Sequence, residues 1–555
     1  MGGDYVEILS VKNLSFTYPM CKEKALDDVT LKINEGDFVV VCGNSGSGKT
    51  TLLKMLKREI MPKGECQGDV LFKGQSISSL DDRTSAEKIG FVFQKPEQQI
   101  VTDKVWHELA FGLESLGYDS KYIRLRVGEM ANYFGITEMF HKKTEELSGG
   151  QKQLMNLASV MAMSPEILIL DEPTSQLDPI TASDFIQTLK KLNRELGLTV
   201  IITEHRLQEL FPIADKVAVL ENGRLIGYNS PKEICKQLKN NPVSKGFPSA
   251  VQIFNSAEVD GECPLTVKEG REFVSSNFSK RKLEIETTIP NTEVALSLKD
   301  VFFRYEKDSA DILKGTSFSV NKGEIFSVLG GNGSGKTTTL KVLAGILRPY
   351  RGKVLVNGKK MEKKSCQDFS KIGVAMLPQN PETVFIKPSI IEDYTEFSKA
   401  KIIQDYEEKI KAVAESLGVE NLLQKHPYDL SGGEVQRCAI GKILLSSPEI
   451  ILLDEPTKGI DACGKGALKN ILKDLKAQGK TIVIVTHDVE FSAEISDRCG
   501  LFFDGDILAS DVPQRFFSFN NFYTTSVSRI CRGTFENAVT VNDALSIIKE
   551  VQNEN

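Results

Sequence analysis

Two short segments of this chain combine glycines, one lysine and two threonines in the order Gly-x-x-x-x-Gly-Lys-Thr-Thr. The first consists of Gly43, Asn44, Ser45, Gly46, Ser47, Gly48, Lys49, Thr50 and Thr51; the second consists of Gly330, Gly331, Asn332, Gly333, Ser334, Gly335, Lys336, Thr337 and Thr338. Glycines let successive backbone N–H groups converge on one anion, and the lysine adds a positive charge. The pattern predicts two loops that bind the phosphates of a nucleotide.

Carboxylates follow an apolar stretch in both halves of the chain. Asp171 and Glu172 come directly after Ile167 to Leu170, and Asp454 and Glu455 follow a similar run. We expect Thr50, Asp171, Thr337 and Asp454 to provide oxygen ligands for Mg²⁺, because this ion prefers hard oxygen donors. The adjoining Glu172 and Glu455 are suited to orient or deprotonate an attacking water.

A histidine recurs at a matching distance in each half. His205 follows Glu172 by 33 residues, and His487 follows Glu455 by 32. Each comes after a predicted strand, so the sequence predicts that both histidines contact the γ-phosphate and act in catalysis. His107, His141 and His426 have no counterpart in the other half, and we expect ordinary surface or structural roles for them.

The distances between equivalent motifs indicate that whole domains were duplicated. Lys49 and Lys336 are 287 residues apart, and Glu172 and Glu455 are 283 apart. We therefore expect a first domain at 5–236, a connector at 237–293, a second domain at 294–528 and an appendix at 529–555 that ends in a helix. Apolar residues of the connector, such as Val251, Ile253 and Phe254, suggest that part of it is packed.

Elements of an α/β fold must position these side chains. Alternating apolar residues over 6–17 and 29–33 predict antiparallel strands, and the pattern repeats at 296–303 and 318–320. Almost uninterrupted apolar runs occur at 38–42, 167–170, 199–202 and 325–329. Strands without a polar face are typical of a parallel sheet that is covered by helices on both sides. In such a sheet, ligands bind at the carboxyl ends of the strands.

Composition narrows the class of protein. The 555 residues are 41% hydrophobic and 26% charged, with a formal net charge of −6, so a general binder of polyanions is disfavoured. The sequence has neither a run of about 18 apolar residues nor the pattern of a secretion signal. Its ten cysteines include no C-x-x-C pair, so we expect reduced thiols in the cytosol rather than zinc sites or disulfides.

A third motif gives the chain its resemblance to a known family. Leu147–Gln151 reads Leu-Ser-Gly-Gly-Gln and Leu430–Glu434 reads Leu-Ser-Gly-Gly-Glu, each with its serine 23 residues before the aspartate. With the two loops, this signature resembles the ABC ATPases over nearly the whole chain. The resemblance implies two tandem P-loop domains, each with a mostly parallel sheet, an antiparallel β subdomain and a helical subdomain, that hydrolyse ATP with Mg²⁺.

The resemblance also assigns further residues and a geometry. It implies that Tyr18 and Tyr305 stack on adenine, and that Gln94 and Gln379 sense Mg²⁺ and the transporter. In this family two domains dimerise head to tail, so Lys49 is expected to face Ser431 and Gly433, and Lys336 to face Ser148 and Gly150. One chain would then form two complete sites. Glu434 and Lys458 depart from the usual residues of the second signature and the second communicating loop.

Segments after Gln94 resemble one group within the family. Phe93–Gln99 and Glu108–Glu114 are similar to the ATPases of energy-coupling factor importers, whereas the second half matches less well. The resemblance implies an ATPase at the cytoplasmic face of the cell membrane that drives uptake of vitamins or metal ions. Its partners would be an integral membrane scaffold subunit and a small substrate-capture membrane subunit.

Two alternatives remain open. A tandem ATPase of a sugar-type ABC importer has about the same size, although such proteins often carry one degraded site. A ribosome-associated ABC translation factor would need a basic connector to bind RNA. Residues 241–290 contain six basic and seven acidic residues, so we expect no nucleic-acid partner.

Overall fold

The computed structural model describes residues 6–257, 259–285, 293–361 and 373–554. Residue 5, where we expect the first domain to begin, and Cys366 lie outside these ranges. The chain divides into two units, one formed by Met1–Asn255 with Asp260–Thr266 and the other by Ser256–Val259 with Val267–Asn555. The predicted connector is therefore shared between the units, and the predicted boundary after residue 528 falls inside a helix, Ser526–Cys531.

The first unit contains two sheets. The antiparallel sheet has the order β2-β1-β4-β5, and the six-stranded sheet has the order β10-β9-β3-β8-β7-β6. Their strands are β1 (Glu7–Thr17), β2 (Leu26–Asn34), β3 (Phe38–Cys42), β4 (Glu65–Phe72), β5 (Gln75–Ser76), β6 (Ile89–Val92), β7 (Ile167–Asp171), β8 (Thr199–Thr203), β9 (Lys216–Glu221) and β10 (Arg224–Asn229). Within the larger sheet, only β10 runs antiparallel to its neighbour.

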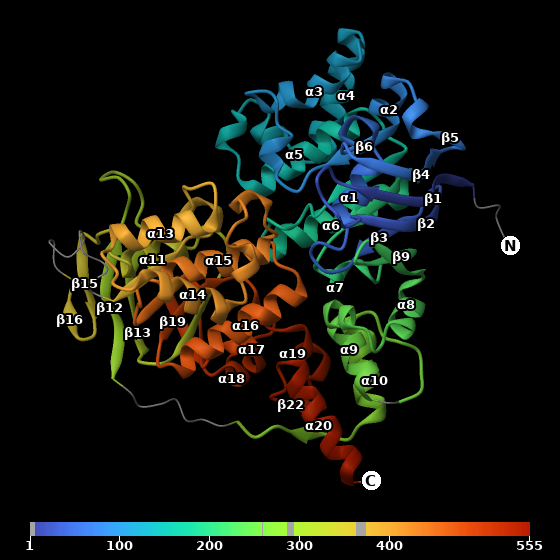
Figure 1. The fold of residues 1–555 in the computed structure, drawn as a ribbon. Coiled ribbons are helices and arrows are strands. Elements are labelled where there is room, and N and C mark those ends of the chain that lie inside the picture. Colours follow the sequence, from blue (N-terminus) through green and yellow to red (C-terminus); the bar gives the residue numbers. More distant parts are fainter. Residues whose placement is uncertain (1–5, 258, 286–292, 362–372, 555) are drawn as a thin grey trace. The chain divides into compact units, whose positions relative to one another are not determined.

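Helices of the first unit connect and cover these strands (Figure 1). They are α1 (Lys49–Met55), α2 (Asp82–Lys88), α3 (Val105–Ser115), α4 (Ser120–Tyr133), α5 (Gly149–Ala162), α6 (Pro179–Leu196), α7 (Leu207–Leu210), α8 (Pro231–Gln237) and α9 (Ser249–Ala257). Helix α6 begins after the cap Asp178 and ends before Gly197, whose φ is 66°. Glycine tolerates this left-handed conformation, so it ends the helix.

The second unit repeats the order of both sheets. The antiparallel sheet is β13-β12-β15-β16, and the six-stranded sheet is β17-β18-β19-β14-β20-β21. The strands are β12 (Val294–Phe303), β13 (Leu313–Asn321), β14 (Ile325–Leu329), β15 (Arg351–Val356), β16 (Lys359–Lys360), β17 (Val374–Leu377), β18 (Ile450–Asp454), β19 (Thr481–Thr486), β20 (Arg498–Phe503) and β21 (Asp506–Asp511). This equivalence confirms that complete folds, and not only motifs, are duplicated.

After one additional helix at the start, the described helices of the second unit follow the same succession. They are α10 (Val267–Asn277), α11 (Lys336–Leu343), α13 (Ile390–Ala400), α14 (Tyr406–Leu417), α15 (Gly432–Leu444), α16 (Ala462–Ala477), α17 (Val489–Ile495), α18 (Pro513–Phe519), α19 (Ser526–Cys531) and α20 (Val541–Glu554). The predicted helix at the end of the appendix is α20. A short parallel pair, β11 (Arg281–Lys282) with β22 (Phe535–Glu536), joins the connector to the appendix.

Solid apolar strands form the cores, as their sequences predict. Every residue of β3, β7, β8, β14, β18 and β19 is buried. Val251, Ile253 and Phe254 of the connector are also buried, which confirms that this segment is packed.

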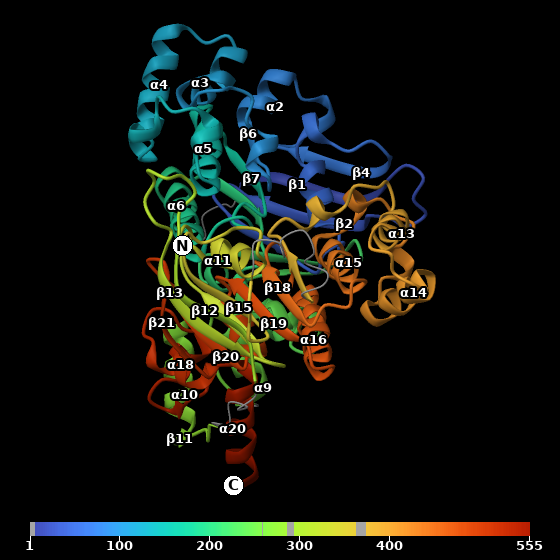
Figure 2. The same cartoon turned by 90° about the vertical axis from the view of Figure 1, so that its left-hand side faces the viewer.

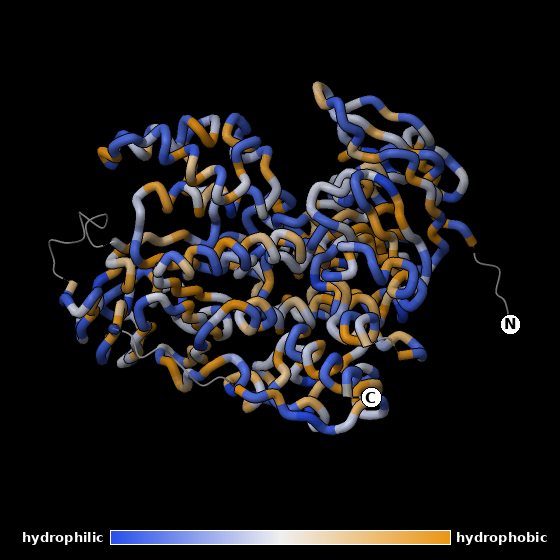
Figure 3. Tube along the Cα trace, turned by 60° about the horizontal axis from the view of Figure 1, so that its bottom comes forward, coloured by the Kyte–Doolittle hydropathy of each residue, from blue (hydrophilic) through white to orange (hydrophobic). Residues whose placement is uncertain are grey.

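Hydrophobic and hydrophilic stretches alternate along the trace in Figure 3. Among the described residues, no helix is long and apolar enough to cross a membrane.

Candidate nucleotide-binding sites

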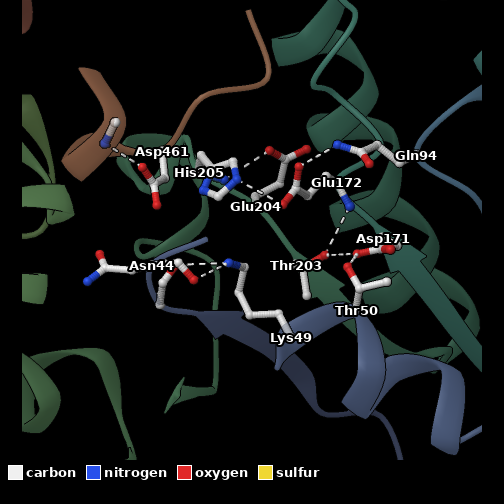
Figure 4. Close-up of polar contacts among 12 residues, drawn as sticks. Asn44, Lys49, Thr50, Gln94, Asp171, Glu172, Thr203, Glu204, His205 and Asp461 are labelled. Carbon is white, nitrogen blue, oxygen red and sulfur yellow. Dashed lines mark hydrogen bonds and ion pairs between the residues drawn. The ribbon is translucent and has the colours of Figure 1, made fainter. Parts of the chain in front are cut away.

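Each glycine-rich loop connects the end of a buried strand to the start of a helix, and its lysine lies across the loop. Lys49 is the first residue of α1, and its Nζ donates to the carbonyls of Gly43 and Asn44 at 2.9 and 3.0 Å (Figure 4). Lys336 begins α11 and donates to Gly330 and Gly331 at 2.9 and 2.8 Å. Both charged groups therefore lie at a helix N-terminus, where an anion is stabilised.

Glycine is required at the first position of both loops. A Cβ at Gly43, whose φ is +146°, would lie 2.2 Å from the carbonyl oxygen of Leu220. A Cβ at Gly330 would lie 2.4 Å from the carbonyl oxygen of Phe502. Any side chain would push the loop away from the neighbouring strand, so these glycines set the curvature of the loop.

Two hydroxyls in the loops fit a phosphate ligand. Within the described part of the chain, Ser47 Oγ and Ser334 Oγ are buried and make no hydrogen bond. A buried hydroxyl without a partner is costly. Phosphate oxygens would provide acceptors for both, so the two loops fit a nucleoside triphosphate.

Hard oxygen donors lie together beside each loop. Thr50 Oγ1 donates to Asp171 Oδ1 at 3.1 Å, and Thr337 Oγ1 donates to Asp454 Oδ1 at 3.1 Å. Burial raises the pKa of Asp171, and burial raises the pKa of Asp454 to about 6. A divalent cation would offset the cost of burying these carboxylates, so both pairs fit Mg²⁺.

Glutamate and histidine are in contact in both units. His205 Nε2 lies 2.8 Å from Glu172 Oε1, and His487 Nδ1 lies 2.9 Å from Glu455 Oε2. Glu172 and Glu455 both have positive φ, 43° and 48°. This conformation is unfavourable for a side-chain-bearing residue and is held where the surroundings require it. Both units therefore have the same arrangement: a glutamate with positive φ in contact with a histidine.

The two glutamines have different surroundings. Gln94 Nε2 donates to Glu172 Oε2 at 2.6 Å, so Glu172 lies between Gln94 and His205 (Figure 4). Gln379 is exposed, in the segment between β17 and the turn at Pro381–Val384. The structure thus brings the predicted glutamine to the carboxylate in the first unit, while its counterpart lies at the surface.

The two predicted adenine-binding tyrosines sit beside their loops. Tyr18 Oη lies 3.1 Å from Thr51 Oγ1, and Tyr305 Oη lies 3.4 Å from Thr338 Oγ1. Each ring packs edge-on against a phenylalanine two residues earlier, Phe16 or Phe303. Their role in stacking on adenine stays a prediction.

The signature serines begin equivalent helices but differ in hydrogen bonding. Ser148 N donates to Gln151 Oε1 at 2.9 Å, and Gln151 N donates back to Ser148 Oγ at 3.3 Å. In the second unit, both Ser431 N and Ser431 Oγ donate to Glu434 Oε2 at 2.8 Å. Glu434 therefore directs the serine hydroxyl proton toward a carboxylate, a consequence that the sequence did not reveal. Gly150 and Gly433 lie in the first turns of these helices, α5 and α15.

Sequence reasoning missed two polar residues beside the predicted site. Thr203 Oγ1 donates to Asp171 Oδ1 at 2.8 Å and accepts from Glu172 N at 2.9 Å. Buried Glu204 accepts from Thr174 N at 2.7 Å, and burial raises its pKa. The sequence signal for these residues was the polar pair Thr203-Glu204 at the end of an otherwise apolar strand. The second half has Val485 and Thr486 at these positions, so comparison of the two halves hid the signal.

The other histidines lie away from the loops. His107 Nε2 is 3.4 Å from Glu114 Oε2, His141 packs against Phe140, and His426 Nδ1 accepts from Tyr428 N at 3.2 Å. No cluster of three or more metal-ligating side chains was found in the described ranges.

Comparison with known proteins agrees with this repeated geometry. The sequence model of the family described as ABC transporter matches residues 26–175 and 313–458. This chain belongs to the ABC transporter ATP-binding proteins. The ABC ATPase is 40% identical over 547 residues to an ABC transporter ATP-binding protein of Bacillus cereus, covering 97% of this chain and 98% of the relative. A relative from Methanosarcina acetivorans is 33% identical, covering 90% of this chain and 84% of the relative.

A solved structure, cbiO1 of Clostridium perfringens, is 31% identical and is described as part of the ABC transporter complex cbiONQ. It covers 44% of this ABC ATPase and 98% of its own chain, with a TM-score of 0.38. The family membership rests on the two matched regions and the full-length relatives. It makes this protein an ATPase of the transporter type.

Proposed function

We propose that this ABC ATPase is the energy-coupling subunit of a membrane importer of the energy-coupling factor type. The single observation that carries its chemical part is the contact between glutamate and histidine, which recurs beside a glycine-rich loop in each unit. The importer type is supported by the segments Phe93–Gln99 and Glu108–Glu114. Vitamins or metal ions are the proposed cargo.

In the proposed reaction, Lys49 and Lys336 neutralise β- and γ-phosphate oxygens of ATP. Thr50 with Asp171, and Thr337 with Asp454, would hold Mg²⁺, which supplies positive charge to the phosphates; Gln94 and Gln379 would join its shell. Glu172 and Glu455 orient and deprotonate water, while His205 and His487 donate to the γ-phosphate. The contact with histidine holds each glutamate in place before the nucleotide arrives.

We further propose that both sites are completed head to tail. The hydroxyl and backbone donors of Ser431 and Gly433 would reach the nucleotide of Lys49, and those of Ser148 and Gly150 would reach the nucleotide of Lys336. Glycine permits close approach, and these donors lie at helix N-termini, where a phosphate is stabilised. Closure on two ATP molecules would then move the docked membrane subunits.

The proposed partners are an integral membrane scaffold and a small substrate-capture membrane protein, with the ATPase at the cytoplasmic face. The test is affinity purification of tagged, full-length protein from detergent-solubilised membranes of its own cells. We expect two membrane proteins to copurify, one multi-span and one small. Recovery of a pair of large permeases with a soluble binding protein would instead indicate a sugar-type importer, and cosedimentation with ribosomes would contradict the proposal.

A further inference from the structure

The third residue after each predicted catalytic histidine makes an equivalent hydrogen bond. Gln208, three residues after His205, accepts from the backbone N–H of Ser249 through Oε1 at 3.0 Å. Glu490, three residues after His487, accepts from the backbone N–H of Ser526 through Oε1 at 2.6 Å. The two acceptors differ in charge, but the donor is the first residue of a helix in both cases, α9 or α19.

Both donor helices belong to segments that are themselves repeated. Helix α8 begins at Pro231 and α18 at Pro513, and the donor helix follows each of them. Leu265–Val267 and Val539–Val541 then share the pattern apolar-Thr-Val before α10 and α20. We call 231–277 the first tail and 513–554 the second tail. The predicted connector covers most of the first tail, whose last helix, α10, belongs to the second unit.

The second tail also packs against the strand that leads to its phosphate-binding loop. Val539 belongs to one apolar cluster with Leu329, the last residue of β14, and Ala493 of α17. Helix α10 lies beside α19 in Figure 1, and the Arg271 guanidinium donates to the carbonyl of Arg529 at 2.9 and 2.7 Å. Figure 2 shows α10, α20 and β11 gathered at the same end.

In the first unit, the end of α7 contacts its tail in a similar way. Phe211, directly after α7, packs against Phe247 of the tail with ring centroids 5.4 Å apart. Each histidine-bearing loop is therefore held against its tail by one hydrogen bond and by apolar contacts. The first N–H groups of a helix have no acceptor within the helix, so loss of either bond would leave that donor without its partner.

We propose that Gln208 and Glu490 are positioning residues. Through their hydrogen bonds, the position of each tail helix sets the position of His205 or His487. The inference rests on the proposed role of these histidines. A histidine that moves toward a γ-phosphate carries the acceptor three residues later with it, because His205 and Gln208 are separated by a single short turn. A tail that holds its helix in place thereby fixes the histidine for hydrolysis, and a tail that shifts withdraws it.

The test uses full-length protein with one site inactivated. In a Glu172→Gln background, which leaves the His487 site, we expect Glu490→Ala to lower kcat about tenfold with KM for ATP changed less than about twofold. Glu490→Gln should restore kcat to within about twofold, because a carboxamide oxygen accepts the same N–H. In a Glu455→Gln background, Gln208→Ala should behave as Glu490→Ala does.

A second variant removes the donor without touching α17. Ser526 is the first residue of α19 after the cap Thr525, a position where proline is tolerated, and Ser526→Pro deletes the N–H. We expect Ser526→Pro to reproduce the fall in kcat and to add nothing to Glu490→Ala. The matched control is Glu494→Ala on α17, the helix of Glu490. The Glu494 carboxylate pairs with Lys469 at the surface at 2.6 Å, so this variant should leave kcat unchanged.

Amide hydrogen exchange at Ser526 measures the proposed coupling between nucleotide binding and the second tail. We expect the Ser526 amide of wild-type protein to exchange more slowly with a nonhydrolysable ATP analogue than without nucleotide, and Glu490→Ala to abolish that difference. Normal kcat in Glu490→Ala despite faster exchange would overturn the inference, as would exchange that the substitution does not change. Loss of hydrolysis in His487→Ala with normal kcat in Glu490→Ala would refute this inference alone. Full hydrolysis in His487→Ala would refute the proposed function.

Discussion

At the scale of single residues, the proposed chemistry depends on two strained glutamates. Glu172 and Glu455 hold positive φ at the ends of fully buried strands, and each contacts a histidine. Sequence comparison between the halves predicted these four residues, because the same types recur at matching distances. It did not predict Thr203 or Glu204, since hydrogen bonds between a side chain and a neighbouring strand leave no periodic signal.

Separate substitution of the two glutamates tests whether both sites work. Glu172→Gln and Glu455→Gln should each lower hydrolysis at their own site at least about 100-fold, since a carboxamide cannot accept the proton of water. Total steady-state hydrolysis should fall by roughly half in each. Single-turnover hydrolysis measures this; complete loss in one variant with no change in the other would rule out two equal sites.

Glu434 provides a second prediction at the same scale. Its carboxylate accepts a hydrogen bond from the hydroxyl of Ser431, which would otherwise be free to donate to a γ-phosphate. Glu434→Gln removes a negative charge from the expected phosphate environment, so KM for ATP should fall about threefold to tenfold at the site of Lys49. The measurement is made in a Glu455→Gln background. The reciprocal change, Gln151→Glu, is measured at the site of Lys336 in a Glu172→Gln background. An unchanged KM would show that the signature serine does not meet nucleotide.

At the scale of elements, strands were more predictable than tails. The alternating and solid apolar runs correspond to β1, β3, β7, β8 and β14 because strand burial follows directly from side-chain spacing. The tails have mixed composition, and their packing depends on contacts distant in sequence, such as Arg271 with Arg529. Sequence reasoning therefore predicted a connector but not the hydrogen bonds that link it to the appendix.

Glu490 makes the stability of the second unit depend on pH. Burial raises the pKa of Glu490 to about 7 from 4.5, and the nearby Asp488 and Glu494 act in the same direction. The favourable contribution of the protonated form is complete below pH 4.5 and is lost as pH rises to about 7, because the unfolded carboxyl ionises first. One pKa unit corresponds to about 1.4 kcal/mol, so the loss is roughly 3–4 kcal/mol.

Glu490→Gln should remove that pH dependence. We expect the variant to gain thermal stability relative to wild type at pH 8 and to match it at pH 4.5. Thermal unfolding at both pH values measures the difference. An equal midpoint for Glu490→Gln and wild type at pH 8 would contradict the assigned burial of this carboxylate.

At the scale of the whole molecule, the predicted assembly places the ATPase on a membrane scaffold. Glu97 lies in the short turn after Gln94, exposed beside Lys152 at 3.2 Å, and Glu382 occupies the equivalent turn. If basic residues of the scaffold meet these carboxylates, Glu97→Lys with Glu382→Lys should reduce copurification of the membrane subunits at least about tenfold. ATP binding should be unchanged, and unaltered assembly would remove this contact from the proposal.

We propose above all that each ATP is bound by residues from both halves of the chain. An experimentally determined structure with Mg²⁺ and a nonhydrolysable ATP analogue tests it most directly. We predict one γ-phosphate within hydrogen-bond distance of Lys49 Nζ and Ser431 Oγ, and the other within that distance of Lys336 Nζ and Ser148 Oγ. Two analogue molecules each bound within a single domain, with the opposite signature serine far from the phosphates, would contradict the account.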